Sequence, residues 1–71
     1  MSVARVTEIS STSEQSFEDA IRQGLARATK TLRNVKGAWI KEQEVEIEGD
    51  AITTFMVTMI VTFILDDQSG Q

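Results

Sequence analysis

The chain contains no cysteine and no histidine, and it has few aromatic and few basic residues. Disulfides are therefore excluded, and so are the side chains that most often bind zinc. Seven Lys and Arg against eleven Asp and Glu leave a net charge of -4. Because this is the wrong sign for a protein that binds phosphate backbones, we expect no nucleic-acid partner.

Long apolar runs are also missing. The longest apolar stretch, near the C-terminus, is interrupted by threonines and is too short to span a bilayer. The N-terminal residues do not show a basic segment followed by a long apolar run. We expect a soluble, cytoplasmic protein with no membrane partner.

The 71 residues make one domain, residues 1–71. A chain this short buries only about 60% of the surface that its unfolded form exposes. Small chains are usually reinforced by disulfides, metals or assembly. With the first excluded and the usual zinc ligands missing, self-assembly is the reinforcement that we expect.

The first half of the chain predicts a strand and then a helix. Residues 3–9 are rich in β-branched side chains, which favour a strand. Apolar residues then recur every three or four positions, so we expect a helix over about residues 13–34. Thr12 or Ser13 is the expected cap, with Gln15 three residues after Thr12 in capping-box spacing.

The second half predicts a β-hairpin. Residues 39–48 and 51–65 alternate with a period of two, and Gly49 and Asp50 between them form a turn signal. The hairpin is therefore expected to be antiparallel. The polar residues 66–71 are expected to fray.

Together these elements predict an α+β fold, a βαββ subunit in which one helix packs on a three-stranded antiparallel sheet. The last strand is apolar on both faces, and only one of them can be covered by the single helix. The side chains expected on the uncovered face are Ile52, Met56, Ile60 and Ile64. Such a strip is typical of an association surface, although threonine-rich strand faces also tolerate water.

Strict alternation along residues 39–48 places Trp39 and Lys41 on one face and the glutamates on the other. The glutamate row is Glu42, Glu44, Glu46 and Glu48. Carboxylates spaced about 6 to 7 Å apart on a strand could hold a hard cation or pair as acid and base. A solvated strand face explains the same row, and we assign no metal site to it.

We find no catalytic constellation. A serine nucleophile needs an adjacent base, and the chain has no histidine to supply one. The glycines form no phosphate-binding loop, so we expect no enzyme. Trp39, the single tryptophan, either fills the core or offers an indole face on which a planar ligand stacks.

Over nearly its whole length the chain resembles the dodecin family. The resemblance lies in the order, length and spacing of several segments, which are residues 11–14, 17–21, 26–28, 31–35, 39, 45–49 and 55–65. It implies βαββ subunits assembled into a hollow homododecamer. It also implies flavins stacked in pairs between tryptophans at the subunit interfaces, with a role in flavin storage or buffering without catalysis.

Carried over to this chain, the resemblance makes Trp39 the stacking residue and Met56 a neighbour of the polar edge of the flavin ring. Glu44 is at a position where some relatives contact the ribityl hydroxyls. Flavin-binding relatives typically have glutamine in place of Met56, and FMN-holding ones often have arginine in place of Glu46 and sometimes of Ile64. The expected cofactor is therefore FMN or riboflavin, with FMN losing more affinity. The alternative is a dodecin-like shell that binds no flavin and acts as a structural or cation-binding particle.

Overall fold

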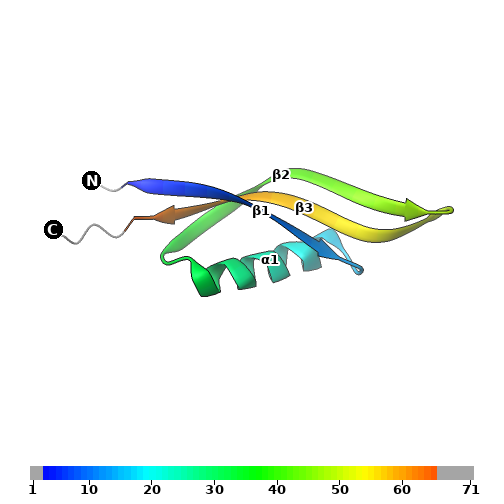
Figure 1. Ribbon diagram of the computed structural model, residues 1–71, viewed down its shortest axis with the longest axis horizontal. Helices are drawn as coiled ribbons and strands as arrows, with labels where there is room; N and C mark the ends of the chain where they lie inside the picture. The colour runs from blue at the N-terminus through cyan, green and yellow to red at the C-terminus, as the bar shows by residue number, and fades with distance from the viewer. Residues whose placement is uncertain (1–2, 66–71) are drawn as a thin grey trace.

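The computed structural model describes residues 3–65, and it confirms the predicted order of one strand, one helix and two strands (Figure 1). The elements are β1 (Ala4–Ser13), α1 (Phe17–Thr31), β2 (Val35–Glu48) and β3 (Ala51–Ile64). The sheet is antiparallel throughout, and β3 lies in the centre in the order β1-β3-β2. The expected fraying of residues 66–71 lies outside the described residues.

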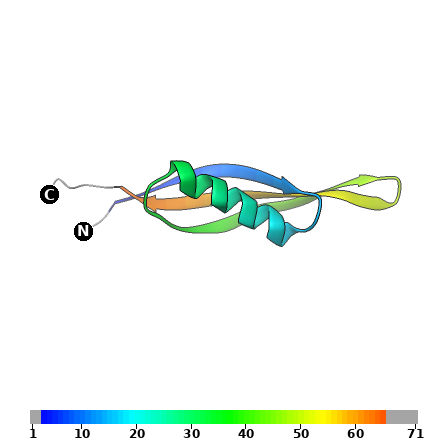
Figure 2. The ribbon, with the colours of Figure 1, turned by 90° about the horizontal axis from the view of Figure 1, so that it is seen from below.

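The helix α1 covers one face of the sheet and leaves the other uncovered (Figure 2). The core lies between α1 and the middle of β3, where Val57, Met59 and Val61 are fully buried. They pack against a helix stripe of small residues that includes Ala20 and Gly24. This confirms the predicted pairing of the helix stripe with one face of β3.

The first strand is longer than the sequence predicts. It continues past residue 9 to Ser13, which pairs with Phe55 of β3. The serines at the end of β1 have no strong strand preference of their own, and Thr12 is the single β-branched residue among them. They stay extended because the long central strand offers them backbone partners.

The expected helix start and cap are therefore wrong. Ser16 is the cap, and its Oγ accepts a hydrogen bond from the backbone N–H of Asp19 at 2.9 Å. Ser13 is buried at the end of β1, where its Oγ accepts from the backbone N–H of Gln15 at 2.9 Å and donates to Asp19 Oδ2 at 2.6 Å. The choice among Thr12, Ser13 and Ser16 as the cap depends on where β1 ends.

The helix also ends earlier than predicted, at Thr31 rather than near residue 34. Asn34 has a left-handed backbone with φ of 62°, so the chain reverses there and β2 begins at Val35. The Asn34 carbonyl accepts a hydrogen bond from the Ile64 backbone N–H at 3.1 Å. This contact ties the turn to the end of the central strand.

A bulge in β2 changes which residues share a face. The pairing with β3 shifts between Ile40 and Glu42, so that Trp39 lies opposite Ile60 and Glu42 lies opposite Thr58. Residues directly opposite each other in an antiparallel pair project from the same side of the sheet. Glu42, Glu44 and Glu46 therefore share the face of Trp39, and the predicted strict alternation, which separated them, is wrong. A second shift after Glu46 pairs Glu48 with Ala51, so Glu48 leaves the predicted glutamate row.

The β2–β3 hairpin projects well beyond β1 (Figure 1), and its turn has the left-handed Gly49, with φ of 64°. Its exposed apolar side chains include Ile47 and Ile52, which pair across the two strands. The subunit measures 57 × 19 × 13 Å with a radius of gyration of 15.1 Å, against about 11 Å for a compact domain of this length. So elongated a shape leaves much apolar surface uncovered.

Candidate functional site

We call the side of the sheet that α1 does not cover the open face. The register places its side chains in rows that run across the three strands. These rows are Glu8, Ile60 and Trp39; then Ser10, Thr58 and Glu42; then Thr12, Met56 and Glu44; and then Thr54 and Glu46.

Trp39 is the one large aromatic side chain in these rows. It is 55% exposed although it lies in the middle of a β-strand, so it does not fill the core of its own subunit. Ile60 lies opposite it on β3 and adds an aliphatic side chain next to the indole. An exposed indole next to an aliphatic side chain is a surface on which a planar ring can stack.

Met56 and Glu44 lie directly opposite each other, and the structure brings these two predicted site residues together. Trp39 shares their face but does not lie in their row. Its partner Ile60 is four residues from Met56 along β3, which corresponds to about 13 Å. A ligand stacked on Trp39 would therefore have to extend along the strand to reach Met56 of the same subunit.

Glu46 of β2 and Ile64 of β3 lie toward opposite ends of the sheet. Glu46 is opposite Thr54, whereas Ile64 is opposite Ala4. Thr54 and Ile64 are ten positions apart along β3, which corresponds to about 33 Å. One small ligand cannot touch both positions in the same subunit, so a site that used both would combine two copies of the chain.

An ion pair crosses the open face beside Trp39. Lys41 Nζ lies 3.3 Å from Glu8 Oε1, and both side chains are about half exposed. Because β3 separates their strands, the Lys41 side chain extends over the central strand. Strict alternation correctly places Lys41 on the face of Trp39, but it cannot predict the contact with Glu8, which depends on the strand order.

The glutamates of β2 follow one another along the strand rather than around a centre. Glu42, Glu44 and Glu46 project from the open face in successive rows. Over residues 3–65, no three acidic side chains converge closely enough to hold a metal ion. Further oxygen ligands would have to come from another molecule.

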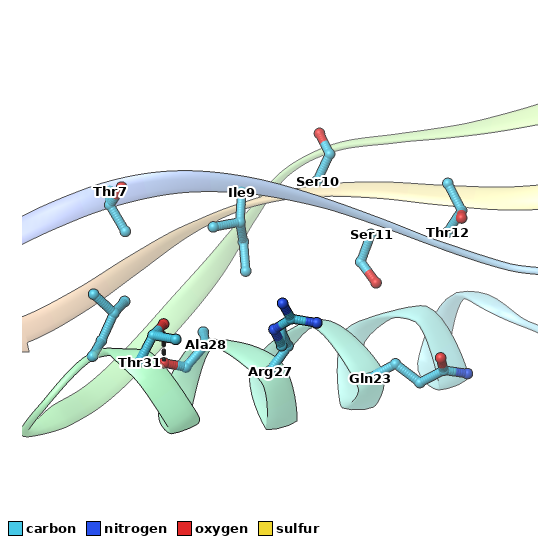
Figure 3. Close-up of a pocket in the computed structure, with 11 residues that line it drawn as sticks. Thr7, Ile9, Ser10, Ser11, Thr12, Gln23, Arg27, Ala28 and Thr31 are labelled. Carbon is cyan, nitrogen blue, oxygen red and sulfur yellow. Dashed lines mark hydrogen bonds between the residues drawn. The ribbon is translucent and has the colours of Figure 1, made fainter.

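A groove of about 570 Å³ lies between α1 and β1, on the side of the sheet away from Trp39 (Figure 3). Its lining combines apolar side chains with hydroxyls, and the Arg27 guanidinium points into it. The groove contains none of the predicted site residues Trp39, Glu44 and Met56. On the open face the candidate site is a surface, and a second molecule is needed to enclose it.

Comparison with known proteins identifies this type of subunit. The family model for dodecin matches residues 3–66. A dodecin from Thermus thermophilus is 35% identical over 65 residues, which cover 92% of this chain and 94% of that protein. In the part of the chain that the structure describes, no helix is long and apolar enough to cross a bilayer.

Solved structures show the same relationship. A tryptophan-to-phenylalanine variant of Thermus thermophilus dodecin matches with a TM-score of 0.87 at 35% identity, covering 93% of this chain and 98% of that one. Dodecin from Streptomyces davaonensis matches with a TM-score of 0.86 at 37% identity, covering 92% and 96%. A calcium dodecin from Mycobacterium tuberculosis shares the fold at 23% identity, with a TM-score of 0.78 and coverage of 97% and 99%.

The fold and the open face thus define a small βαββ subunit whose sheet is covered on one side only. The chain belongs to the dodecin family.

Proposed function

We propose that the protein is a non-enzymatic flavin-binding protein that stores or buffers flavin between subunits of a homododecamer. The observation that carries the proposal is Trp39, which is 55% exposed on the uncovered face of the sheet. A half-exposed tryptophan beside an aliphatic side chain leaves apolar surface in water unless something covers it. A planar, electron-poor ring stacked on the indole, and sandwiched against a second copy of it, supplies that cover.

Assembly is supported by the size and shape of the subunit. The uncovered rows include Ile60 and Met56, and the projecting hairpin exposes Ile47 and Ile52. A monomer of 71 residues without disulfides gains little by leaving these side chains in water. Pairing open faces would bury them and would enclose a ligand at the same time.

Met56 and Glu44 would complete the site in different ways. The Met56 thioether packs against the ring but is a weak hydrogen-bond acceptor and donates none. The Glu44 carboxylate, exposed in the same row, accepts hydrogen bonds from hydroxyl groups. The side chains of this row therefore favour the sugar-alcohol part of a flavin more than the polar edge of its ring.

Fluorescence titration of the purified oligomer with riboflavin and FMN tests the proposal. We expect flavin emission to be quenched at micromolar protein, because an indole stacked on the ring deactivates the excited flavin. Trp39→Ala should abolish the quenching and leave the oligomer mass unchanged, whereas Trp39→Phe, which keeps an aromatic face, should still bind. No quenching by the unmodified protein, or collapse of the oligomer in Trp39→Ala, would contradict the proposal.

A cation-binding particle is the second candidate. It is supported by the row of three glutamates on the open face and by the calcium dodecin that shares the fold. Calorimetry with calcium on the purified oligomer distinguishes the two. The cation-binding role would be favoured if the unmodified protein is colourless, quenches no flavin and releases or absorbs heat on calcium binding. That heat should disappear in Glu44→Gln.

A further inference from the structure

We propose that Lys41 is the residue that lets this acidic open face accept the phosphate of a phosphorylated flavin. The inference rests on the proposed flavin site and adds a specificity residue to it. It starts from the ion pair with Glu8, which shows that the Lys41 side chain crosses the face on which Trp39 lies.

The position of Lys41 follows from its pairing. Its neighbours in the chain align with residues 58 and 59 of β3, and Glu8 lies opposite Ile60. The ammonium group therefore passes over β3 beside the row that contains Trp39. A ring stacked on the indole would have this cation at its border.

The charge on this face makes the cation important. Its rows contain four carboxylates, Glu8, Glu42, Glu44 and Glu46. Among the described side chains placed on these rows, Lys41 is the cation that crosses them. Without its charge, a phosphate that enters this surface would meet only like charge.

The ion pair with Glu8 can be exchanged at low cost. Both side chains are about half exposed, at 49% and 52%, and the N–O distance of 3.3 Å is long for a charge-assisted hydrogen bond. A phosphate carries more charge than a carboxylate and has three acceptor oxygens. Lys41 can therefore turn from Glu8 to the phosphate when the ligand binds.

The test compares FMN with riboflavin on the same purified oligomer. Lys41→Gln should weaken the binding of FMN about threefold and leave the affinity for riboflavin unchanged, because only FMN carries the phosphate. The matched control is Lys30→Gln, which removes the same charge from the exposed last turn of α1, in the other layer. It should leave the ratio of the two affinities as it is.

Glu8→Gln provides the opposite change. Removing the competing carboxylate should tighten the binding of FMN about twofold or more and leave the affinity for riboflavin unchanged. If Lys41→Gln leaves the ratio of FMN to riboflavin affinity unchanged, or weakens both flavins equally, the proposed role of Lys41 is wrong. Quenching of riboflavin by the unmodified protein would still support the flavin site in that case. Quenching by neither flavin would overturn both proposals.

Discussion

Single residues on the open face take their roles from the backbone around them. Trp39 and Lys41 are two residues apart and both project from the face that the helix leaves uncovered. One extra residue in the pairing of β2 brings the glutamates that follow onto the same face. A bulge of this kind redirects side chains without changing the sequence of the strand. The indole, the ammonium group and the glutamates therefore meet on one surface.

Met56 is the residue at which a single substitution should strengthen the proposed site. Met56→Gln adds an amide donor and acceptor in the row that already contains Glu44. We expect flavin affinity to rise several-fold, since one added hydrogen bond contributes about 1 kcal/mol. Fluorescence titration measures the change, and Met56→Leu is the control without hydrogen-bonding atoms. Equal affinities of the two variants would show that the ring edge does not lie near this residue.

At the scale of elements, the close approach of α1 to the sheet depends on Gly24. A Cβ at this position would lie 2.7 Å from Met59 Cε and 2.9 Å from Ser11 Cβ. The methionine end can move, but the Ser11 Cβ is attached directly to the backbone of β1. The stripe of small residues thus determines how near the helix lies to the strands.

Gly24→Ala should therefore lower the free energy of unfolding although alanine favours helices. Overpacking costs about 1 to 3 kcal/mol, against a gain of about 1 kcal/mol in helix propensity. Thermal denaturation should show a lower midpoint. Gly37→Ala is the matched control, since a Cβ there meets nothing within 4 Å. A Gly24→Ala variant as stable as the unmodified protein would mean that the helix can move outward freely.

At the scale of the whole molecule, the subunit is elongated and has two layers, the sheet and one helix. The helix covers one side of the sheet, whereas the open face and the projecting hairpin remain uncovered, with no layer packed on them. Residues 3–65 contain one helix, α1, and it lies on the side opposite the open face. In the proposed homododecamer, other copies of the chain would cover the open face.

A charge on the hairpin should therefore disrupt assembly. Ile52 is 53% exposed in the subunit, so Ile52→Lys should not disturb the monomer but should shift the oligomer toward a subunit of 7.9 kDa, since an interface core disfavours an unpaired charge. Light scattering after gel filtration measures the mass. Ala26→Lys, on the exposed part of α1, is the control. An intact oligomer in Ile52→Lys would place the hairpin outside the interfaces.

Much of the architecture was predictable from the sequence. Period-two and helical patterns indicated the strands and the helix, and the apolar faces of residues 51–65 indicated both the core and the uncovered side. Trp39 stands out as the single tryptophan, whereas its flavin role and that of Met56 come from the resemblance to dodecins. Their assignment to the flavin stays a prediction. These features can be predicted because each buried side chain must be apolar, so that buried positions recur in the sequence with the period of the strand or helix.

Tertiary structure alone decided the length of β1, the choice of Ser16 as cap and the face of Trp39. Each depends on which backbone groups pair with β3, a strand far away in the sequence. Lys41 reaches Glu8 for the same reason. Periodicity reports what a residue prefers in isolation, whereas a bulge arises only when two strands of unequal local length must stay hydrogen-bonded side by side.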